Sequence, residues 1–172
     1  MSKIQFRLLK PSEIEVRRSY AKKDGDNLYL LFIDSRSVVK LLDETVGAMN
    51  WQTDFYEVNG QMFGKLGIWD DDKNQWVWKS DVGSETNIEA QKGAVSDCYK
   101  RLLARWGVTE LYTAPKIRID NPNKYTNYYV SSISYTDDRC ICALQLVDKF
   151  GNVVFDCRAA VGCVCAVGLR NG

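Results

Sequence analysis

The sequence predicts an α+β fold with an antiparallel β-β-β-α core. In this core a three-stranded meander packs on one long helix, with an N-terminal helix before it and a β-rich C-terminal extension after it. Three observations predict this class. Apolar and aromatic stretches follow one another across short turns in residues 51–80. A helical apolar stripe runs through residues 88–106. Strand-like stretches then follow one another from residue 125, without the strand–helix alternation of a parallel sheet.

The N-terminal segment, residues 9–23, is predicted to form a short helix. Pro11 suits the first turn of a helix, and Glu13 and Glu15 favour the positive end of its dipole. A turn is expected over residues 24–27, where Asp, Gly and Asn dominate.

A strand and a helix are predicted next. Residues 28–34 are apolar and aromatic, which is typical of a strand. Residues 35–46 carry an apolar stripe with helical spacing, and Gly47 is a plausible stop after it.

The meander is predicted from its turns. Its strands are expected at residues 51–58, 61–69 and 75–80. Asn59-Gly60 is typical of a two-residue hairpin turn. The acidic run Asp70-Asp71-Asp72 lies between two strands, where Asp is a preferred turn former. We therefore interpret this run as a turn and not as a divalent-metal site.

The long helix has two distinct faces. Thr86 or Asn87 can cap its start, and Gly107 ends it. A core face is predicted for Val95, Cys98, Tyr99, Leu102, Leu103 and Trp106. The opposite face combines small residues with charges: Gly93, Ala94, Asp97, Lys100, Arg101 and Ala104, with Arg105 at its margin. Such a face suits a phosphate backbone, but a solvated surface has the same pattern.

The chain beyond the helix is predicted to form a separate extension. Residues 113–124 contain two prolines and suggest a connection. Strands are expected at residues 125–135, 139–148 and 153–156, and residues 157–172 are ambiguous between strand and buried coil. We expect a core domain over residues 1–115 and a hairpin extension over residues 116–172, which would pack on the core or on a neighbouring subunit.

The composition limits which kinds of catalytic site the protein can contain. Of the 172 residues, 45% are hydrophobic and 26% are charged, so a packed core is expected. Histidine is absent, which excludes imidazole-based nucleophile, acid–base and zinc sites. No phosphate-binding glycine motif occurs. We therefore expect a binding protein without catalytic residues, cofactor or metal, and not an enzyme; divalent-dependent nicking of DNA would be the enzymatic alternative.

Cysteines and apolar runs bear on the compartment. The C-x-C pairs Cys140/Cys142 and Cys163/Cys165 place both thiols on one strand face and lack the usual zinc-knuckle spacing. We expect reduced, buried thiols. Neither a secretory signal nor an apolar run long enough to span a membrane is visible, so a cytoplasmic protein without a membrane partner is expected.

Charge is segregated along the chain although the formal net charge is only +1. Residues 1–23 hold seven bases and two acids, residues 24–90 five bases and thirteen acids, and residues 91–172 eleven bases and seven acids. A local basic strip can bind a polyanion on a nearly neutral protein. The same segregation also suits head-to-tail association of subunits.

Several stretches, taken in order, resemble one family. They are residues 9–14 (LKPSEI) with Arg17, 29–36 (YLLFIDSR), 41–47 (LLDETVG) with Asn50-Trp51, 81–86 (DVGSET), 92–101 (KGAVSDCYKR), Trp106-Gly107-Val108 and Leu111-Tyr112. This pattern resembles the Rad-fifty-two-type single-strand annealing proteins, especially their short phage and prophage members. The resemblance covers roughly residues 9–115.

The resemblance implies both a function and a site. Family members form rings or helical filaments, bind single-stranded DNA in an outer basic groove with the bases outward, and pair complementary strands without ATP in recombination and DNA repair. The groove positions are matched by Arg36, Lys92, Lys100 and Arg101, with Lys40 and Arg105 as additions. A bacterial host cytoplasm is implied, with a phage exonuclease or a single-strand-binding protein as possible partners.

The sequence also departs from the family pattern. Val108-Thr109-Glu110 places an acid where phage members often have a base. The segment between Gly83 and Lys92 is short and lacks the lysines of eukaryotic members, which argues against a second DNA site. Glu110 and the low net charge motivate an alternative, a structural or adaptor oligomer of the same fold with little DNA binding.

Overall fold

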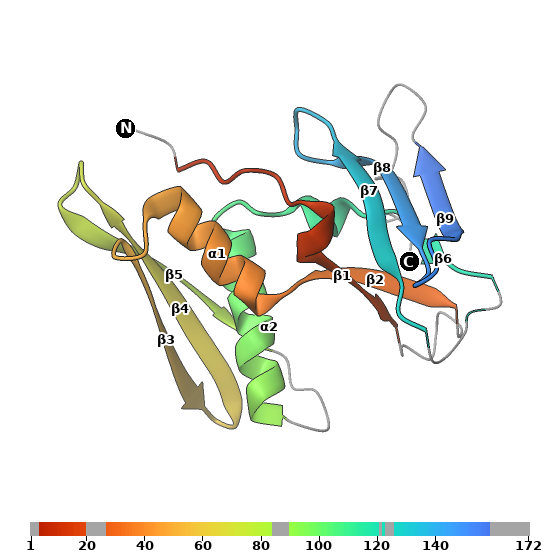
Figure 1. Ribbon diagram of the computed structural model, residues 1–172. Coiled ribbons are helices and arrows are strands. Elements are labelled where there is room, and N and C mark those ends of the chain that lie inside the picture. The colour runs from red at the N-terminus through yellow and green to blue at the C-terminus, as the bar shows by residue number, and fades with distance from the viewer. Residues whose placement is uncertain (1–3, 20–26, 84–89, 121, 123–125, 159–172) are drawn as a thin grey trace, which may run out of the picture. The chain divides into compact units, whose positions relative to one another are not determined.

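A computed structural model describes residues 4–19, 27–83, 90–120, 122 and 126–158, apart from the side chains of residues 90–94 and 96 (Figure 1). By its contacts the chain forms two compact units. The meander unit comprises Met1–Arg7 and Ser35–Val108, and the six-stranded unit comprises Leu8–Asp34 and Thr109–Gly172.

The meander unit contains one antiparallel sheet and two α-helices. Its elements are α1 (Ser35–Val46), β3 (Trp51–Val58), β4 (Gln61–Asp70), β5 (Gln75–Val82) and α2 (Ala90–Arg105), with the strands in the order β3-β4-β5. The hairpin turn at Asn59-Gly60 is confirmed, because both residues have positive φ angles of 52° and 76°. Gly47 and Gly107 also have positive φ and follow the ends of α1 and α2, as expected.

The core of the meander unit lies between the sheet and both helices. The predicted apolar stripe of α2 is confirmed at its centre, where Cys98, Leu102 and Leu103 are almost completely buried. They share the core with Leu66 and Ile68 of β4 and with Val38, Leu41 and Leu42 of α1. Gly64 on β4 allows the close approach of α2, because a Cβ atom there would lie 2.6 Å from the Cys98 sulfur.

The six-stranded unit is one curled antiparallel sheet. Its strands are β1 (Ile14–Arg18), β2 (Leu28–Ile33), β6 (Ile117–Arg118), β7 (Tyr129–Tyr135), β8 (Ile141–Val147) and β9 (Val153–Arg158), in the order β6-β2-β1-β7-β8-β9. Two 3-10 turns, η1 (Pro11–Glu13) and η2 (Glu110–Thr113), precede β1 and β6. Ile14, Leu144 and Leu146 belong to its buried core.

The predicted α+β class with a helix-centred core is wrong. The described chain is mostly β, with nine strands and only two α-helices, of 12 and 16 residues. The expected N-terminal helix is the turn η1 followed by strand β1, because Ile14 pairs with Ile33 and Val16 with Leu31 of β2. Strand pairing with a distant segment thus overrides the helix-start signals of Pro11 and Glu13.

The chain after α2 is also organised differently from a simple appendage. Strands β7 to β9 were expected as hairpins, and they occur. They join β1 and β2 in one sheet through the pairing of Glu15 with Tyr129. The division into a functional annealing domain and a C-terminal extension stays a prediction.

One charged pair is buried in the six-stranded unit. The side chain of Glu110 is fully buried and pairs with the guanidinium of Arg139. The second carboxylate oxygen, Oε2, and the Arg139 Nε are both buried without a hydrogen-bond partner. Glu110 therefore adds no exposed acidic surface.

Some of the remaining predictions concern described residues, and others concern residues that the structure does not describe. Cys98 is buried as expected, whereas Cys140, Cys142 and Cys157 are only half-buried. The predicted caps Thr86 and Asn87, the turn over 24–26 and the pair Cys163/Cys165 lie outside the described residues. Neither α1 nor α2 has the length and apolar character needed to cross a membrane.

Candidate nucleic-acid interface

The candidate site lies where the edge strand β5 runs along α2. Alternate residues of a strand point to opposite faces of the sheet. Asp81 pairs in register with Gly64, and Lys79 with Leu66, so both share the face that packs on α2. A carboxylate and an ammonium therefore meet the cationic last turns of the helix.

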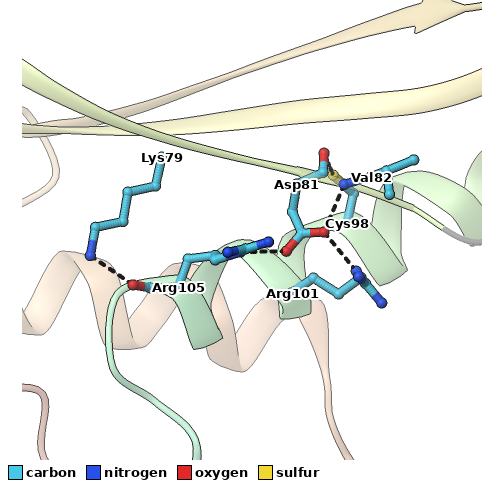
Figure 2. Close-up of polar contacts among 6 residues, drawn as sticks. All are labelled: Lys79, Asp81, Val82, Cys98, Arg101 and Arg105. Atoms are coloured by element: carbon cyan, nitrogen blue, oxygen red, sulfur yellow. Dashed lines mark hydrogen bonds and ion pairs between the residues drawn. The ribbon is translucent and has the colours of Figure 1, made fainter.

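Asp81 binds two arginines of α2. Figure 2 shows its carboxylate between them: Arg101 Nε donates to Oδ1 over 2.9 Å and Arg105 Nε donates to Oδ2 over 2.8 Å. The backbone N–H of Val82 also donates to Oδ1, over 2.8 Å. Arg101 and Arg105 are one helical turn apart, so a single carboxylate holds them as neighbours. We call Asp81, Arg101 and Arg105 the arginine–aspartate cluster.

Burial and hydrogen bonding have opposite effects on the pKa of the Asp81 carboxyl group. Partial burial by itself raises the pKa of the carboxyl group. The hydrogen bonds from Arg105, Val82 and Arg101 outweigh it and hold the pKa below its usual value. The side chain of Asp81 is only 8% exposed, whereas those of Arg101 and Arg105 are 42% and 60% exposed. The acid is thus inside the cluster, and the cations form its outer surface.

Lys79 ties the same strand to the end of the helix. Its Nζ donates to the backbone carbonyl of Arg105 over 2.7 Å (Figure 2). The same Nζ lies 4.4 Å from the centre of the Trp106 ring. A cation at the C-terminal carbonyls of a helix is favoured by the helix dipole. This bond fixes the last turn of α2, and with it the backbone position of Arg105.

The predicted site residues are distributed over two helices of the meander unit. Arg101 and Arg105 are brought together in the cluster, and Lys100 next to them is half-buried. Arg36 is exposed on α1. Lys40 is also exposed there and lies 3.8 Å from Glu44. The backbone of Lys92 belongs to α2, but its side chain lies outside the described part.

Sequence reasoning missed two members of this site. Asp81 has no evident partner in the sequence, yet it accepts hydrogen bonds from two cations. Lys79 is not among the site residues that the sequence predicts. The register of the predicted meander contains the missing signal, since positions 77, 79 and 81 of one strand must face the same side as Leu66 and Ile68. An acid and a base on the helix-facing side of an edge strand require partners on that helix.

The thiol of Cys98 lies just under the cluster but is not available for chemistry. Its Sγ donates to the backbone carbonyl of Asp81 over 3.5 Å. Burial, together with the nearby charges of Asp81 and Asp97, raises the pKa of this thiol to about 11. Among the described residues, no group of three or more Cys, Asp or Glu side chains could hold a metal ion.

The acidic turn after β4 has a structural role, as interpreted from the sequence. Lys73 Nζ lies 2.7 Å from the Asp70 carboxylate, and the indole N–H of Trp69 donates to Asp71 over 2.9 Å. A cavity of about 560 Å³ extends from this turn to Lys79 and Trp106. Its wall mixes apolar side chains with these paired charges.

No family model matches the chain, and no curated protein matches it. Any assignment of function to this chain therefore rests on its own side chains, above all on the arginine–aspartate cluster.

Proposed function

We propose that this chain binds single-stranded DNA and anneals complementary strands without ATP, as an oligomeric ring or filament acting in recombination and repair. The observation that carries the proposal is the arginine–aspartate cluster. Two partly exposed guanidinium groups are held one helical turn apart by one carboxylate whose side chain is only 8% exposed. The sequence resemblance to single-strand annealing proteins includes Asp81 and Arg101, with Arg105 as an addition to the matched positions.

The cluster suits a phosphate backbone for physical reasons. Guanidinium groups present fixed forks of N–H donors that match phosphate oxygens, and their charge does not titrate in the physiological range. Asp81 restrains the two side chains, so less side-chain entropy is lost when a phosphate binds. Phosphate contacts carry little sequence information, which suits a protein that has to accept any strand.

Charge limits how strongly one subunit can bind. Asp81 offsets one of the two positive charges, and the whole chain has a net charge of only +1. We therefore expect weak binding by a single subunit and strong binding when many subunits share one strand. Duplex formation is downhill, so annealing on such a surface needs no nucleotide hydrolysis.

The test compares the wild type with Arg101→Gln/Arg105→Gln. Binding to a long unstructured oligonucleotide is measured over a range of salt concentrations, and annealing is followed with labelled complementary strands. Each lost phosphate contact lowers the slope of log affinity against log salt by about 0.7 for single strands. The double variant should therefore bind more weakly, show a slope smaller by about 1.4, and anneal slowly.

Arg158→Gln is the matched control, because Arg158 is an exposed arginine beside an aspartate, Asp156, in the other unit. It should bind and anneal like the wild type. If the Arg101/Arg105 variant assembles normally and keeps the wild-type affinity and salt slope, the assignment of the DNA site to these two arginines is wrong. If the wild type itself does not bind DNA at low salt, the adaptor alternative is favoured. A second variant reverses the charge, Lys100→Glu/Arg101→Glu. It should abolish annealing and leave the oligomer intact.

A further inference from the structure

The outer face of the meander sheet, opposite the two helices, is rich in aromatic rings. Both helices contact the same inner face, as shown by the Phe55–Tyr99 ring contact with α2 and the hydrogen bond from Trp51 to Asp43 of α1. Register then places five rings on the outer face, and we call them the aromatic face: Tyr56, Phe63, Trp69, Trp76 and Trp78.

The rings of the aromatic face contact one another in two groups. Tyr56 and Phe63 are stacked, with ring centres 5.9 Å apart and planes 13° apart. Trp76 lies 5.5 Å from Trp69 and 6.1 Å from Trp78. Trp78 and Tyr56 remain 40% and 41% exposed. Exposed clusters of large apolar side chains of this kind mark interaction sites.

Gly67 sets the orientation of Trp78. A Cβ atom at Gly67 would lie 2.8–2.9 Å from three atoms of the indole ring, so only glycine leaves room for the ring against the backbone. The indole therefore lies on the sheet at Gly67 and presents its other side outward. Lys65, on the same face, places its Nζ 5.0 Å from the centre of this ring and 3.2 Å from Asp54.

We propose that the aromatic face stacks the bases of a bound single strand, in contrast to the outward bases that the family resemblance implies; this inference rests on the proposed function. Aromatic side chains on an open sheet stack any base, because every base has a π-face. Lys65 provides a cation beside the stacked bases that can exchange Asp54 for a phosphate. Val58 and Val82 lie beside Tyr56 and Phe63 at one end of this face. The residues between the two groups of rings, Gln52, Gly67 and Ser80, are polar or glycine, which suits sugar and base edges.

The same edge strand connects this face to the arginine–aspartate cluster. Along β5, Trp76 and Trp78 point to the outer face, while Lys79 and Asp81 point to α2. A DNA strand whose phosphates contact Arg101 and Arg105 thus runs beside β5, which carries two of the stacking rings. Phosphate binding at the two arginines and base stacking on the rings then occur on opposite sides of β5, and Lys65 provides a further phosphate contact on the side of the rings.

The experiment compares Trp78→Ala and Tyr56→Ala with the wild type on two ligands, a long oligothymidine and an abasic strand of the same length. Loss of one stacked base is expected to weaken binding to oligothymidine roughly five-fold to a hundred-fold. The salt slope should stay unchanged, because no phosphate contact is lost. On the abasic strand, each variant should bind like the wild type.

Three controls make the result specific. Trp78→Phe keeps a ring and should retain most of the affinity. Tyr112→Ala removes an exposed tyrosine of the other unit and should have no effect. Lys65→Gln should lower the salt slope, in contrast to the ring variants.

The outcomes separate the two proposals. The proposal of base stacking on this face is wrong if the ring variants bind oligothymidine like the wild type. It is also wrong if they lose as much affinity for the abasic strand as for oligothymidine. In both cases the proposed function stands. If they change the mass of the native assembly instead, the face is a subunit interface, which also overturns the inference. If the wild type binds neither ligand, both proposals fail.

Discussion

Replacing Asp81 with asparagine tests whether the arginine–aspartate cluster stabilises the meander unit. The substitution keeps the size of the side chain and removes its negative charge. The carboxylate accepts hydrogen bonds from Arg101, Arg105 and the Val82 N–H, all between 2.8 and 2.9 Å. Asparagine offers one acceptor oxygen and turns an N–H₂ group toward a guanidinium, so at least one of the arginine bonds is lost.

The magnitude follows from the exposure of the arginines. Since Arg101 and Arg105 are 42% and 60% exposed, each pair is screened by solvent and contributes at most about 1 kcal/mol. Two such pairs on one carboxylate set the expected loss for Asp81→Asn at about 1–2 kcal/mol of unfolding free energy near neutral pH.

The dependence on pH has a defined sign. The folded state lowers the pKa of Asp81 below the ordinary value of 3.8, so the carboxylate binds protons more readily in the unfolded chain. Its contribution is therefore complete above the unfolded pKa and disappears as the pH falls through the folded pKa. The wild type and Asp81→Asn should differ most near neutral pH and converge in strong acid.

The assay is urea unfolding followed by tryptophan fluorescence. All five tryptophans of the chain lie in the meander unit, so the signal reports this unit alone. Asp54→Asn is the matched control, because Asp54 is an exposed aspartate that pairs with one lysine, Lys65. Equal stability of the two variants, or a deficit of Asp81→Asn that persists undiminished at low pH, would refute the reasoning.

Three further predictions concern other contacts. Gly64→Ala should destabilise the meander unit by about 1–3 kcal/mol, because the new methyl would overlap Cys98 and Phe55; an unchanged urea midpoint would contradict the packing described. The Cys98 thiol, with its pKa raised to about 11, should react slowly with thiol reagents until urea unfolds the unit, and rapid labelling of Cys98 in the native protein would count against its burial. Glu110→Gln leaves the charge of Arg139 without its buried partner and should cost about 3–5 kcal/mol, whereas Glu110→Leu combined with Arg139→Met should recover much of it. Hydrogen exchange of the β8 amides measures the stability of the six-stranded unit in both variants. Equal protection in the two would show that the unpaired charge of Arg139 is not the cause of the destabilisation.

Local signals predicted the meander unit well. Asn59-Gly60 and the acidic turn after β4 define two hairpins whose strands pair without a register shift, so strand positions and register followed from neighbouring residues. The end of α2 at Gly107 has an equally local cause, the positive φ of that glycine. These elements need little information from distant parts of the chain.

Distant pairing explains what the sequence did not predict. Residues 14–18 become a strand only because residues 28–33 and 129 lie beside them, and the local signals of Pro11 and Glu13 favoured a helix. The two-residue strand β6 is too short to carry a pattern. At the site, the cations of α2 were predicted individually, whereas Asp81 became visible only when its strand was placed against the helix.

The interleaved chain order of the two units has a consequence for synthesis. Residues 35–108 stand between the two pieces of the six-stranded unit, so β1 and β2 are made long before β6 to β9. A chain still growing on the ribosome can complete its meander unit while the hairpin of β1 and β2 waits for its sheet. The free edge of β1 can then pair with a neighbouring chain until β7 arrives. Chains terminated early, between α2 and β7, should therefore aggregate through this hairpin although their meander unit is complete.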